Sequence, residues 1–445
     1  MKKVITYGTY DLLHFGHIRL LERAKALGDY LIVGVTSDSY DLTRGKINAQ
    51  QSLMERIEAV RATGLADEII VEEYEGQKID DILRYSVEIF AIGSDWAGHF
   101  DYLMEYCEVI YLERTQGVSS SDLRSKDRKI RLGLVGESNI VNKFERESRY
   151  VNGLEISGIF TKDDSVLSSD VKKLSLKANN LEELLKYSDA IYVVSPPNEH
   201  YEQIKMALEH GVHVLCESPI SLSTSQEQEL IELASKRKCI LMSSIKTAYS
   251  TAYYRMLLMV KSGAIGKVLS VDSTCTSMAH LDFNSNDEFK WNSICAWGPT
   301  ALLPIFQILG TDYHKKEIVT HLSHENSTYD LFTRISFIYD DAMASMKVGQ
   351  GAKSEGELII SGTKGYIYVP APWWKTDYFE IRYENVIDNK RFFYQLDGEG
   401  IRYELVFFLK SIKGNIHMQY VDENVSFSIT KVIEDFYNKK DMYLI

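Results

Sequence analysis

A short apolar strand that runs directly into an H-x-G-H loop and a helix constrains the fold of this chain more than any other feature. The segment covers residues 6–17, TYGTYDLLHFGH, and apolar residues at helical spacing follow over residues 18–27. Gly28 is well placed to end that helix. A strand that passes through a glycine-containing loop into a helix predicts an α/β fold.

This arrangement also predicts a site for a triphosphate. The start of a helix offers unpaired backbone N–H groups and the positive end of the helix dipole, where phosphate binds. Gly8 and Gly16 let the backbone approach a ligand closely. His14 and His17 are three residues apart and can reach the same ligand. The alternative is that they are two surface histidines at the start of a helix.

Residues 7–17, 20–25 and 27–31 resemble the glycerol-3-phosphate cytidylyltransferases of the nucleotidyltransferase superfamily. Later motifs recur in the order of that family, so the resemblance extends over about residues 1–125. These motifs are Arg44 with Lys46, Glu55 with Arg56, Lys78, Gly93-Ser94-Asp95-Trp96, and residues 114–121. Ser120 and Ser121 replace two threonines of the family pattern and keep the hydroxyl groups.

The resemblance implies transfer of a cytidylyl group from CTP to a small polyol phosphate, with glycerol 3-phosphate first and ribitol 5-phosphate next. Such a transfer depends on positioning and charge neutralisation, and an ionised acceptor phosphate needs no general base. Mg²⁺ is the expected companion of the departing pyrophosphate, and no protein side chain is assigned to it. In relatives, products of this kind feed surface polymers of bacteria, such as teichoic acids and capsules.

The resemblance also implies the roles of individual residues in this first part of the chain. The catalytic residues would be His14, His17, Lys46 and Arg114. The CTP site would comprise Gly8, Thr9, Tyr10, His14, His17, Lys46, Asp95, Arg114, Thr115, Ser119, Ser120 and Ser121. The acceptor phosphate would face Arg44, Lys78 and Trp96. The alternatives are a solvated surface position for Arg44, Lys46 and Lys78, and core packing for Trp96.

The chain has 445 residues, so further domains must follow. The charged stretch 122–129 precedes a new strand at 130–135, and further strands are expected at 155–160 and 190–195. Helices alternate with these strands, as in a doubly wound dinucleotide-binding sheet.

Residues 189–200 and 207–220 resemble the glucose-fructose oxidoreductase and inositol dehydrogenase family, and residues 262–266 and 360–365 add further matches. The resemblance implies a dinucleotide-binding half and a half with a large open sheet that in relatives lines the substrate site and often builds the dimer. We therefore predict an α/β chain of three domains. These are a cytidylyltransferase domain over residues 1–128, a Rossmann domain over 129–245, and an α+β domain with a mostly antiparallel sheet over 246–445.

The dinucleotide site is predicted from a glycine-poor turn after residue 135 and from the matching segments. Its candidate residues are Gly136, Ser138, Asn139, Ile140, Thr161, Ser195, Pro196, Pro197, His200 and Glu217. Thr161 and Lys162 stand where an NAD-preferring relative would carry an acidic residue, which favours NADP(H).

Three departures from the second family concern its catalytic residues. Ser218 replaces the lysine of an E-K-P motif, and Ala296 and Thr300 stand at the positions of an aspartate and of a histidine or tyrosine. Reduction of a carbonyl needs a proton donor near the oxygen, so we expect ordinary dehydrogenase chemistry to be lost. The expected role is then binding or dimerisation.

Two alternatives for the second half stay open at this point. The half could reduce a keto-sugar phosphate with NADPH through other residues, such as His280, Lys246 or Tyr249. It could instead catalyse a different reaction on the same fold. A further alternative for the whole chain is a nucleotide-binding scaffold or sensor.

Composition restricts the partners and the compartment. The net charge of −13, without a basic run, argues against a nucleic-acid partner. The five cysteines lack C-x-x-C spacing and are typical of reduced thiols in a cytoplasmic protein. We also expect no secretory signal, no membrane insertion and, because both families commonly dimerise, a homodimer.

Overall fold

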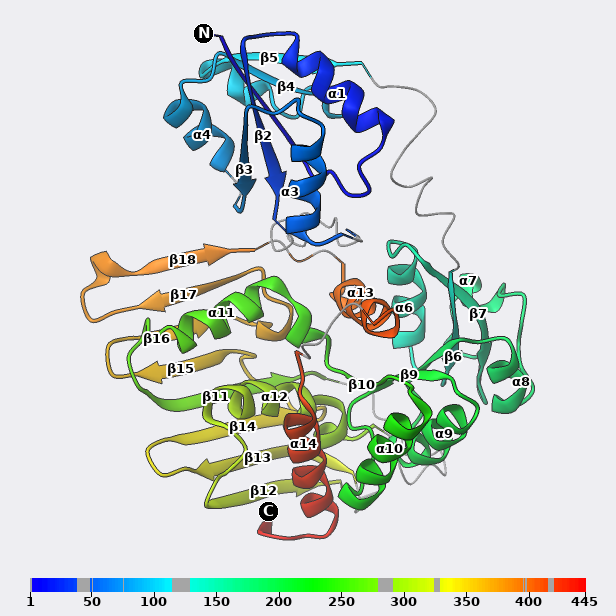
Figure 1. Cartoon of the computed structure of the whole chain (residues 1–445). Helices are drawn as coiled ribbons and strands as arrows, with labels where there is room; N and C mark the ends of the chain where they lie inside the picture. Colours follow the sequence, from blue (N-terminus) through cyan, green and yellow to red (C-terminus); the bar gives the residue numbers. More distant parts are fainter. Residues whose placement is uncertain are drawn as a thin grey trace. The chain divides into compact units, whose positions relative to one another are not determined.

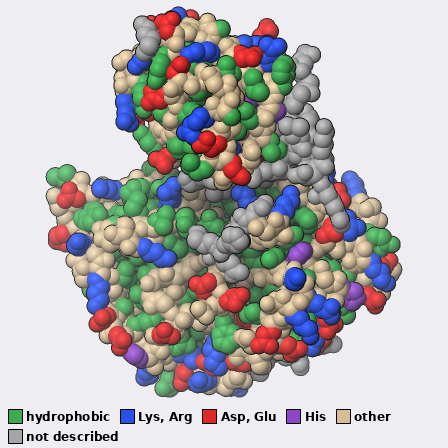
Figure 2. All heavy atoms as spheres, viewed as in Figure 1, with side chains coloured by type: hydrophobic (Ala, Val, Ile, Leu, Met, Phe, Trp, Pro, Cys, Tyr) green, Lys and Arg blue, Asp and Glu red, His purple; other side chains and the backbone are tan. Residues whose placement is uncertain are grey.

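The computed structural model describes residues 2–37, 49, 51–74, 76–113, 129–278, 291–323, 329–394, 396, 398–414 and 420–445. The chain divides into two compact units, Met1–Lys129 and Ile130–Ile445, and each has its own sheets (Figure 1). No helix within the described ranges is long and apolar enough to cross a membrane. Basic and acidic side chains are interspersed over the visible face of the described residues (Figure 2).

The first unit is built on a parallel sheet of five strands in the order β3-β2-β1-β4-β5. Its strands are β1 (Lys3–Gly8), β2 (Tyr30–Thr36), β3 (Glu68–Glu72), β4 (Ile89–Gly93) and β5 (Glu108–Leu112). Its helices are α1 (Phe15–Lys25), α3 (Leu53–Ala62) and α4 (Gln77–Tyr85), with 3-10 turns η1 (Ser94–Trp96) and η2 (Asp101–Glu105). Successive β1 residues Val4 and Ile5 enter two different apolar clusters, so the sheet is buried on both faces.

The topology of this sheet fixes where a ligand can bind. From β1 the chain moves outward through β2 and β3, then crosses to the other side of β1 with β4 and β5. The order therefore reverses between β1 and β4, and open α/β sheets bind ligands beside the carboxyl ends of the strands at this point. The H-x-G-H loop follows β1, and Ser94 follows β4.

Helix α1 begins and ends earlier than its apolar spacing predicts. It spans Phe15–Lys25 rather than 18–27, because His14 supplies the N-cap and the backbone leaves the helix at Ala26. Gly28 instead lets the backbone pass close to β1, since a Cβ there would lie 2.5 Å from the carbonyl oxygen of Lys2.

The second unit begins with another parallel sheet of five strands, in the order β10-β9-β8-β6-β7. Its strands are β6 (Ile130–Val135), β7 (Leu154–Phe160), β8 (Ala190–Val193), β9 (His213–Glu217) and β10 (Leu241–Ser244). The connecting helices are α6 (Ile140–Ser148), α7 (Ser169–Lys172), α8 (Leu181–Lys186), α9 (Pro197–Glu209) and α10 (Thr224–Arg237). Its order reverses between β6 and β8.

A mixed sheet of nine strands completes the second unit, in the order β18-β17-β16-β15-β11-β14-β13-β12-β19. The strands are β11 (Val268–Thr276), β12 (Lys315–Leu322), β13 (Asp330–Ile338), β14 (Met343–Gly349), β15 (Leu358–Gly362), β16 (Tyr366–Val369), β17 (Tyr378–Arg382), β18 (Lys390–Phe393) and β19 (Met442–Leu444). The pairs β11–β14 and β12–β19 are parallel and the others antiparallel. The predicted fold class, two Rossmann-like sheets followed by a large and mostly antiparallel one, is confirmed.

The second unit also contains helices and short 3-10 turns outside its parallel sheet. They are η3 (Lys246–Tyr249), α11 (Thr251–Lys261), α12 (Ser293–Leu309), η4 (Trp373–Lys375), η5 (Val386–Asp388), α13 (Ile401–Ile412) and α14 (Glu423–Tyr437). Helix α12 packs on β11, β13 and β14. Most of its residues from Ser293 to Phe306 are buried.

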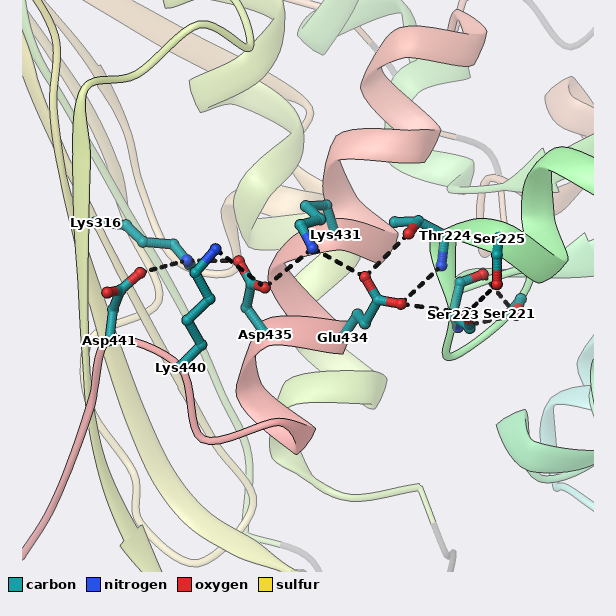
Figure 3. Close-up of polar contacts among 10 residues, drawn as sticks. All are labelled: Ser221, Ser223, Thr224, Ser225, Lys316, Lys431, Glu434, Asp435, Lys440 and Asp441. Atoms are coloured by element: carbon teal, nitrogen blue, oxygen red, sulfur yellow. Dashed lines mark hydrogen bonds and ion pairs between the residues drawn. The ribbon is translucent and has the colours of Figure 1, made fainter.

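Helix α14 connects α10 with strand β12 of the large sheet through two adjacent acidic residues (Figure 3). Glu434 accepts hydrogen bonds from the backbone N–H and the hydroxyl of Thr224, at the start of α10. Asp435 pairs with Lys316 of β12 at 2.6 Å, and both side chains are 3% exposed. A buried charge pair of this kind is strongly destabilised when one partner is lost.

Candidate functional site

The loop after β1 is folded back tightly on the end of the strand. Tyr10 and Leu12 have φ values of 53° and 48°, in the left-handed region that side chains rarely adopt. The buried Tyr10 ring covers Gly8, because a Cβ at position 8 would lie 3.0 Å from the ring. Glycine at this position therefore allows the turn that brings the following residues back to the sheet.

A buried arginine holds this loop in place. Arg56, on α3, donates from Nη1 to the carbonyl oxygens of Thr9 and Thr36, each at 2.8 Å, and from Nε to that of Gln51 at 3.1 Å. Its side chain has no solvent exposure. The Glu55-Arg56 motif did not predict a role for Arg56. The hydrogen bonds of Arg56 show that it holds the loop after β1 against the end of β2.

The segment that precedes α3 also binds the loop directly. The backbone N–H of Leu12 donates to Gln51 Oε1 at 2.8 Å, and the N–H of Gln51 donates to Asp11 Oδ1 at 3.0 Å. Asp11 and Gln51 are not among the residues predicted from the sequence, because polar residues in loops carry no periodic signal. These two hydrogen bonds fix the path of the loop that leads to His14.

His14 caps the helix that carries His17. The backbone N–H of Gly16 donates to His14 Nδ1 at 3.0 Å. A neutral His14 therefore carries its proton on Nε2, from which it can donate to a ligand. The His17 ring stacks on the His14 ring with centroids 3.9 Å apart, and Tyr10 packs edge-on against His17 at 5.5 Å. The structure thus brings both predicted histidines together at the start of α1.

The segment after β4 lies at the neighbouring strand end. Asp95 is exposed, whereas Trp96 is half-buried with its ring 5.8 Å from the Phe100 ring. Trp96 therefore contributes to packing in the described structure, and its contact with an acceptor stays a prediction.

Lys78 lies in the interior of the first unit. Its side chain, on α4, is 5% exposed and forms an ion pair with Glu72 at the end of β3. Its ammonium group also lies 4.7 Å from the centre of the Tyr7 ring and 5.4 Å from that of Phe100. The predicted contact of Lys78 with an acceptor phosphate stays a prediction, and in the described structure its ammonium group pairs with Glu72.

Several predicted residues lie outside the described part of the chain. They are Arg44, Lys46, Arg114, Thr115, Ser119, Ser120, Ser121 and His280. Among the described residues, no group of three or more His, Cys, Asp or Glu side chains is arranged to hold a metal ion.

In the second unit, the turn between β6 and α6 has the form that a dinucleotide-binding strand–loop–helix needs. Gly136 has φ 127°, and a Cβ there would lie 2.6 Å from the backbone nitrogen of Ser195. Ser138, in place of a second glycine, accepts from the backbone N–H of Ile140 at 3.3 Å, and Asn139 stands at the N-cap position of α6 without a side-chain capping bond. The start of a helix presents backbone N–H groups to a phosphate, and the contact of these residues with a dinucleotide stays a prediction.

The other predicted dinucleotide residues hold neighbouring loops together. The buried His200 ring lies between the carbonyl oxygens of Ser195 and Pro219, each 2.8 Å from a ring nitrogen, and burial lowers its pKa. Pro196 and Pro197 begin α9, and Thr161 Oγ1 donates to the carbonyl oxygen of Asp163. His200 is thus a structural link between the ends of β8 and β9.

Glu217 ends β9 and accepts hydrogen bonds from the hydroxyls of Tyr192 and Ser244. Burial raises its pKa, which these bonds and nearby Lys246 oppose. Ser218, beside it, is buried, and Ala296 and Thr300 both lie on α12.

Comparison with known proteins shows that two parts of the chain resemble two different families. Residues 5–126 match the family described as cytidylyltransferase-like. The glycerol-3-phosphate cytidylyltransferase of Bacillus spizizenii is 51% identical over 124 residues, which cover 28% of this chain and 95% of that protein. The enzyme of the same name from Staphylococcus aureus is 45% identical over 130 residues and 95% of its length.

Residues 130–245 match the family described as oxidoreductase family, NAD-binding Rossmann fold. The D-xylose 1-dehydrogenase (NADP(+)) of Hypocrea jecorina is 31% identical over 100 residues, 22% of this chain and 24% of that enzyme. The structure of KijD10, a 3-ketoreductase from Actinomadura kijaniata in complex with NADP and TDP-benzene, covers 72% of this chain and 100% of that one, with TM-score 0.62 and 16% identity. That likeness shows the fold of the second unit.

Proposed function

Because the chain belongs to the glycerol-3-phosphate cytidylyltransferase family through its first unit, joined to an oxidoreductase-family Rossmann domain, we propose that it makes a CDP-polyol from CTP and a small polyol phosphate. Glycerol 3-phosphate is the first acceptor, and ribitol 5-phosphate is the next. The stacked pair His14 and His17 at the start of α1 carries the proposal.

The proposed reaction is an in-line transfer to phosphorus. An acceptor phosphate oxygen attacks the α-phosphorus of CTP, the new P–O bond forms, and the bond to the bridging oxygen breaks to release pyrophosphate. His14 and His17 stabilise negative charge on the phosphate oxygens, with His14 donating from Nε2. The N–H groups at the start of α1 add to this stabilisation. Mg²⁺ bound to the triphosphate would neutralise the charge of the leaving pyrophosphate.

Residues outside the described part complete this proposal. Lys46 and Arg114 would contact the α- and β-phosphates, and the hydroxyls of Ser119, Ser120 and Ser121 the outer phosphates. Arg44 would face the acceptor. The product would serve the synthesis of a bacterial surface polymer.

For the second unit we propose nucleotide binding without ordinary dehydrogenase chemistry. Ser218, Ala296 and Thr300 support this proposal, since none of these side chains readily gives up a proton near neutral pH. The second candidate is NADPH-dependent reduction of a keto-sugar phosphate to the polyol phosphate that the first unit uses.

The test is pyrophosphate release from CTP and Mg²⁺ with glycerol, ribitol, erythritol and sugar phosphates, and in parallel with keto-phosphates plus NADPH. Turnover with one polyol phosphate alone is the expected result. Turnover only with a keto-phosphate and NADPH would favour the second candidate, and no pyrophosphate release in any arm would refute the transferase.

A further inference from the structure

Three lysines of the second unit meet at one carboxylate oxygen. Lys143 of α6 and Lys246 of η3 place Nζ 3.4 Å and 3.7 Å from Glu399 Oε2, and Lys375 of η4 forms an ion pair with the same oxygen. The lysine side chains are 22–35% exposed, and that of Glu399 is 20% exposed. The group, called the lysine cluster below, is accessible to a small ligand. The buried pair Lys316–Asp435, at 3% exposure, is not.

The fold brings these residues together from four separate segments. Lys246 follows the end of β10, whose Ser244 is paired with Glu217 of β9. Lys143 lies in the first turn of α6, after the loop that leaves β6. The cluster therefore lies at the carboxyl edge of the parallel sheet, where α/β proteins bind ligands.

Two further contacts fix the positions of Lys375 and Glu399. The hydroxyl of Thr247 donates to the carbonyl oxygen of Trp374 at 3.2 Å, which holds η3 beside Lys375. Arg402, three residues after Glu399, pairs with the buried Glu147 of α6 at 2.9 Å. Glu399 is thus held next to the helix that carries Lys143.

The cluster has more positive than negative charge. Burial raises the pKa of Glu399, but the Lys375 hydrogen bond and the three lysine charges outweigh it and lower the value to about 2, so this carboxylate is ionised. Burial, and then the charge of Glu217, raise the pKa of Glu404 to about 8, so Glu404 is neutral at pH 7. Among the described residues, three ammonium groups lie near two carboxylates even with Glu217 ionised.

The arrangement also leaves the lysines competing for one acceptor. Three ammonium groups offer nine N–H donors, and Glu399 Oε2 is the oxygen they share. Burial, and then the charge of Lys375, lower the pKa of Lys246, so the nearby like charge adds to the effect of burial. A phosphate group would offer a separate charged oxygen to each lysine, which one carboxylate oxygen does not.

We infer that Lys143, Lys246 and Lys375 form a binding site for the phosphate group of a small molecule, with Glu399 as the internal anion that this phosphate displaces. The phosphate can belong to a small polyol or sugar phosphate, or to a dinucleotide. The inference does not depend on transferase activity in the first unit.

The test is a fluorescence titration of the full-length chain carrying Trp96→Phe, since the remaining tryptophans, 291, 297, 373 and 374, all lie in the second unit. Trp374 precedes Lys375, so its emission is a local probe. The ligands are inorganic phosphate, glycerol 3-phosphate, ribitol 5-phosphate and NADP⁺. We expect saturable binding that weakens as the salt concentration rises.

Two charge variants should change the affinity for phosphate in opposite directions. Lys375→Gln should weaken binding about tenfold, the effect of losing one charge-assisted contact. Glu399→Gln should strengthen it, because the competing carboxylate is gone. Lys267→Gln is the matched control, since Lys267 pairs with Asp341 at an exposed position of the same unit and should leave binding unchanged.

The ligand panel distinguishes the two sources of phosphate. Tight binding of a polyol phosphate with this variant pattern supports a small phosphate ester, and the same pattern with NADP⁺ alone supports a dinucleotide phosphate. Absence of saturable binding for all ligands would overturn the inference, as would equal affinities of the parent, Lys375→Gln and Glu399→Gln proteins.

Discussion

Individual buried polar residues carry much of the precision of this molecule. Arg56 binds three carbonyl oxygens at the root of the H-x-G-H loop, and Glu404 keeps a proton inside the second unit. Neither residue touches the phosphates in the proposed reaction. Loss of the Arg56 charge would destabilise the loop after β1, and ionisation of Glu404 would destabilise the core of the second unit.

Replacing Arg56 with methionine should destabilise the first unit by about 3 kcal/mol, because the carbonyl oxygens of Thr9 and Thr36 lose their charged donor. Urea unfolding followed by circular dichroism measures the change. Arg19→Met is the control, since Arg19 is an exposed residue of α1 that pairs with Glu22. Equal stability of the two variants would show that Arg56 does not hold the loop.

His17→Ala should abolish pyrophosphate release while leaving the fold intact, because the ring acts on phosphate charge and is only half-buried. Turnover and circular dichroism measured on the same preparation check both parts. His210→Ala, at an exposed position of the second unit, should retain turnover. Retained activity in the His17 variant would remove the role proposed for this histidine.

Glu404 should make stability depend on pH. Its pKa rises from 4.5 to about 8 on folding, so between these values the folded state holds a proton that the unfolded state has released. Stability should therefore fall as pH rises through this window, by up to about 1.4 kcal/mol per pH unit from this group. Glu404→Gln should flatten that slope in denaturant unfolding, and Glu209→Gln, at an exposed position, should not.

At the scale of elements, the first turn of α1 combines a structural and a chemical role in one side chain. His14 accepts from Gly16 through Nδ1 and leaves Nε2 for a ligand. The start of the helix therefore depends on the residue that would contact phosphate, which also explains why the helix begins before its apolar spacing does.

The two roles of His14 can be separated by substitution. Asparagine is a good N-cap residue, so His14→Asn should keep the stability of the first unit, whereas His14→Ala should lose about 1 kcal/mol. Both variants should lose pyrophosphate release. Urea unfolding and turnover measured side by side test this, and an active His14→Asn protein would contradict the phosphate contact.

At the scale of the whole molecule, the units 1–129 and 130–445 have separate apolar cores. Within the second unit, α14 joins α10 to strand β12 of the large sheet through Glu434 and Asp435 (Figure 3). Damage to this helix should therefore unfold the second unit and spare the chemistry of the first.

Lys316→Met should destabilise the second unit by about 3–5 kcal/mol, since Asp435 would remain as a buried charge without its closest partner. Pyrophosphate release should be retained. Lys440→Met is the control, because Lys440 is 58% exposed and lies 3.9 Å from Asp435. Loss of turnover in the Lys316 variant at a temperature where the first unit is folded would contradict the independence of the two units.

The sequence by itself determined the fold class and both family relationships. Apolar runs such as residues 130–135 predict buried parallel strands, and the ordered motifs after the H-x-G-H loop predict the first family. These signals are local, since a few adjacent residues carry each of them. The pairing of His14 with His17 was predictable for the same reason, because one helical turn separates them.

Only the tertiary structure decided which polar residues are buried and which meet. The sequence motifs offered Lys78 a phosphate contact or a solvated surface position. Its burial beside Glu72, Tyr7 and Phe100 depends on the packing of α4 on the sheet. Residues 143, 246, 375 and 399 look like ordinary charged positions, and they converge because four separate segments end at one sheet edge. Burial and long-range contact depend on packing between distant segments, which no local pattern records.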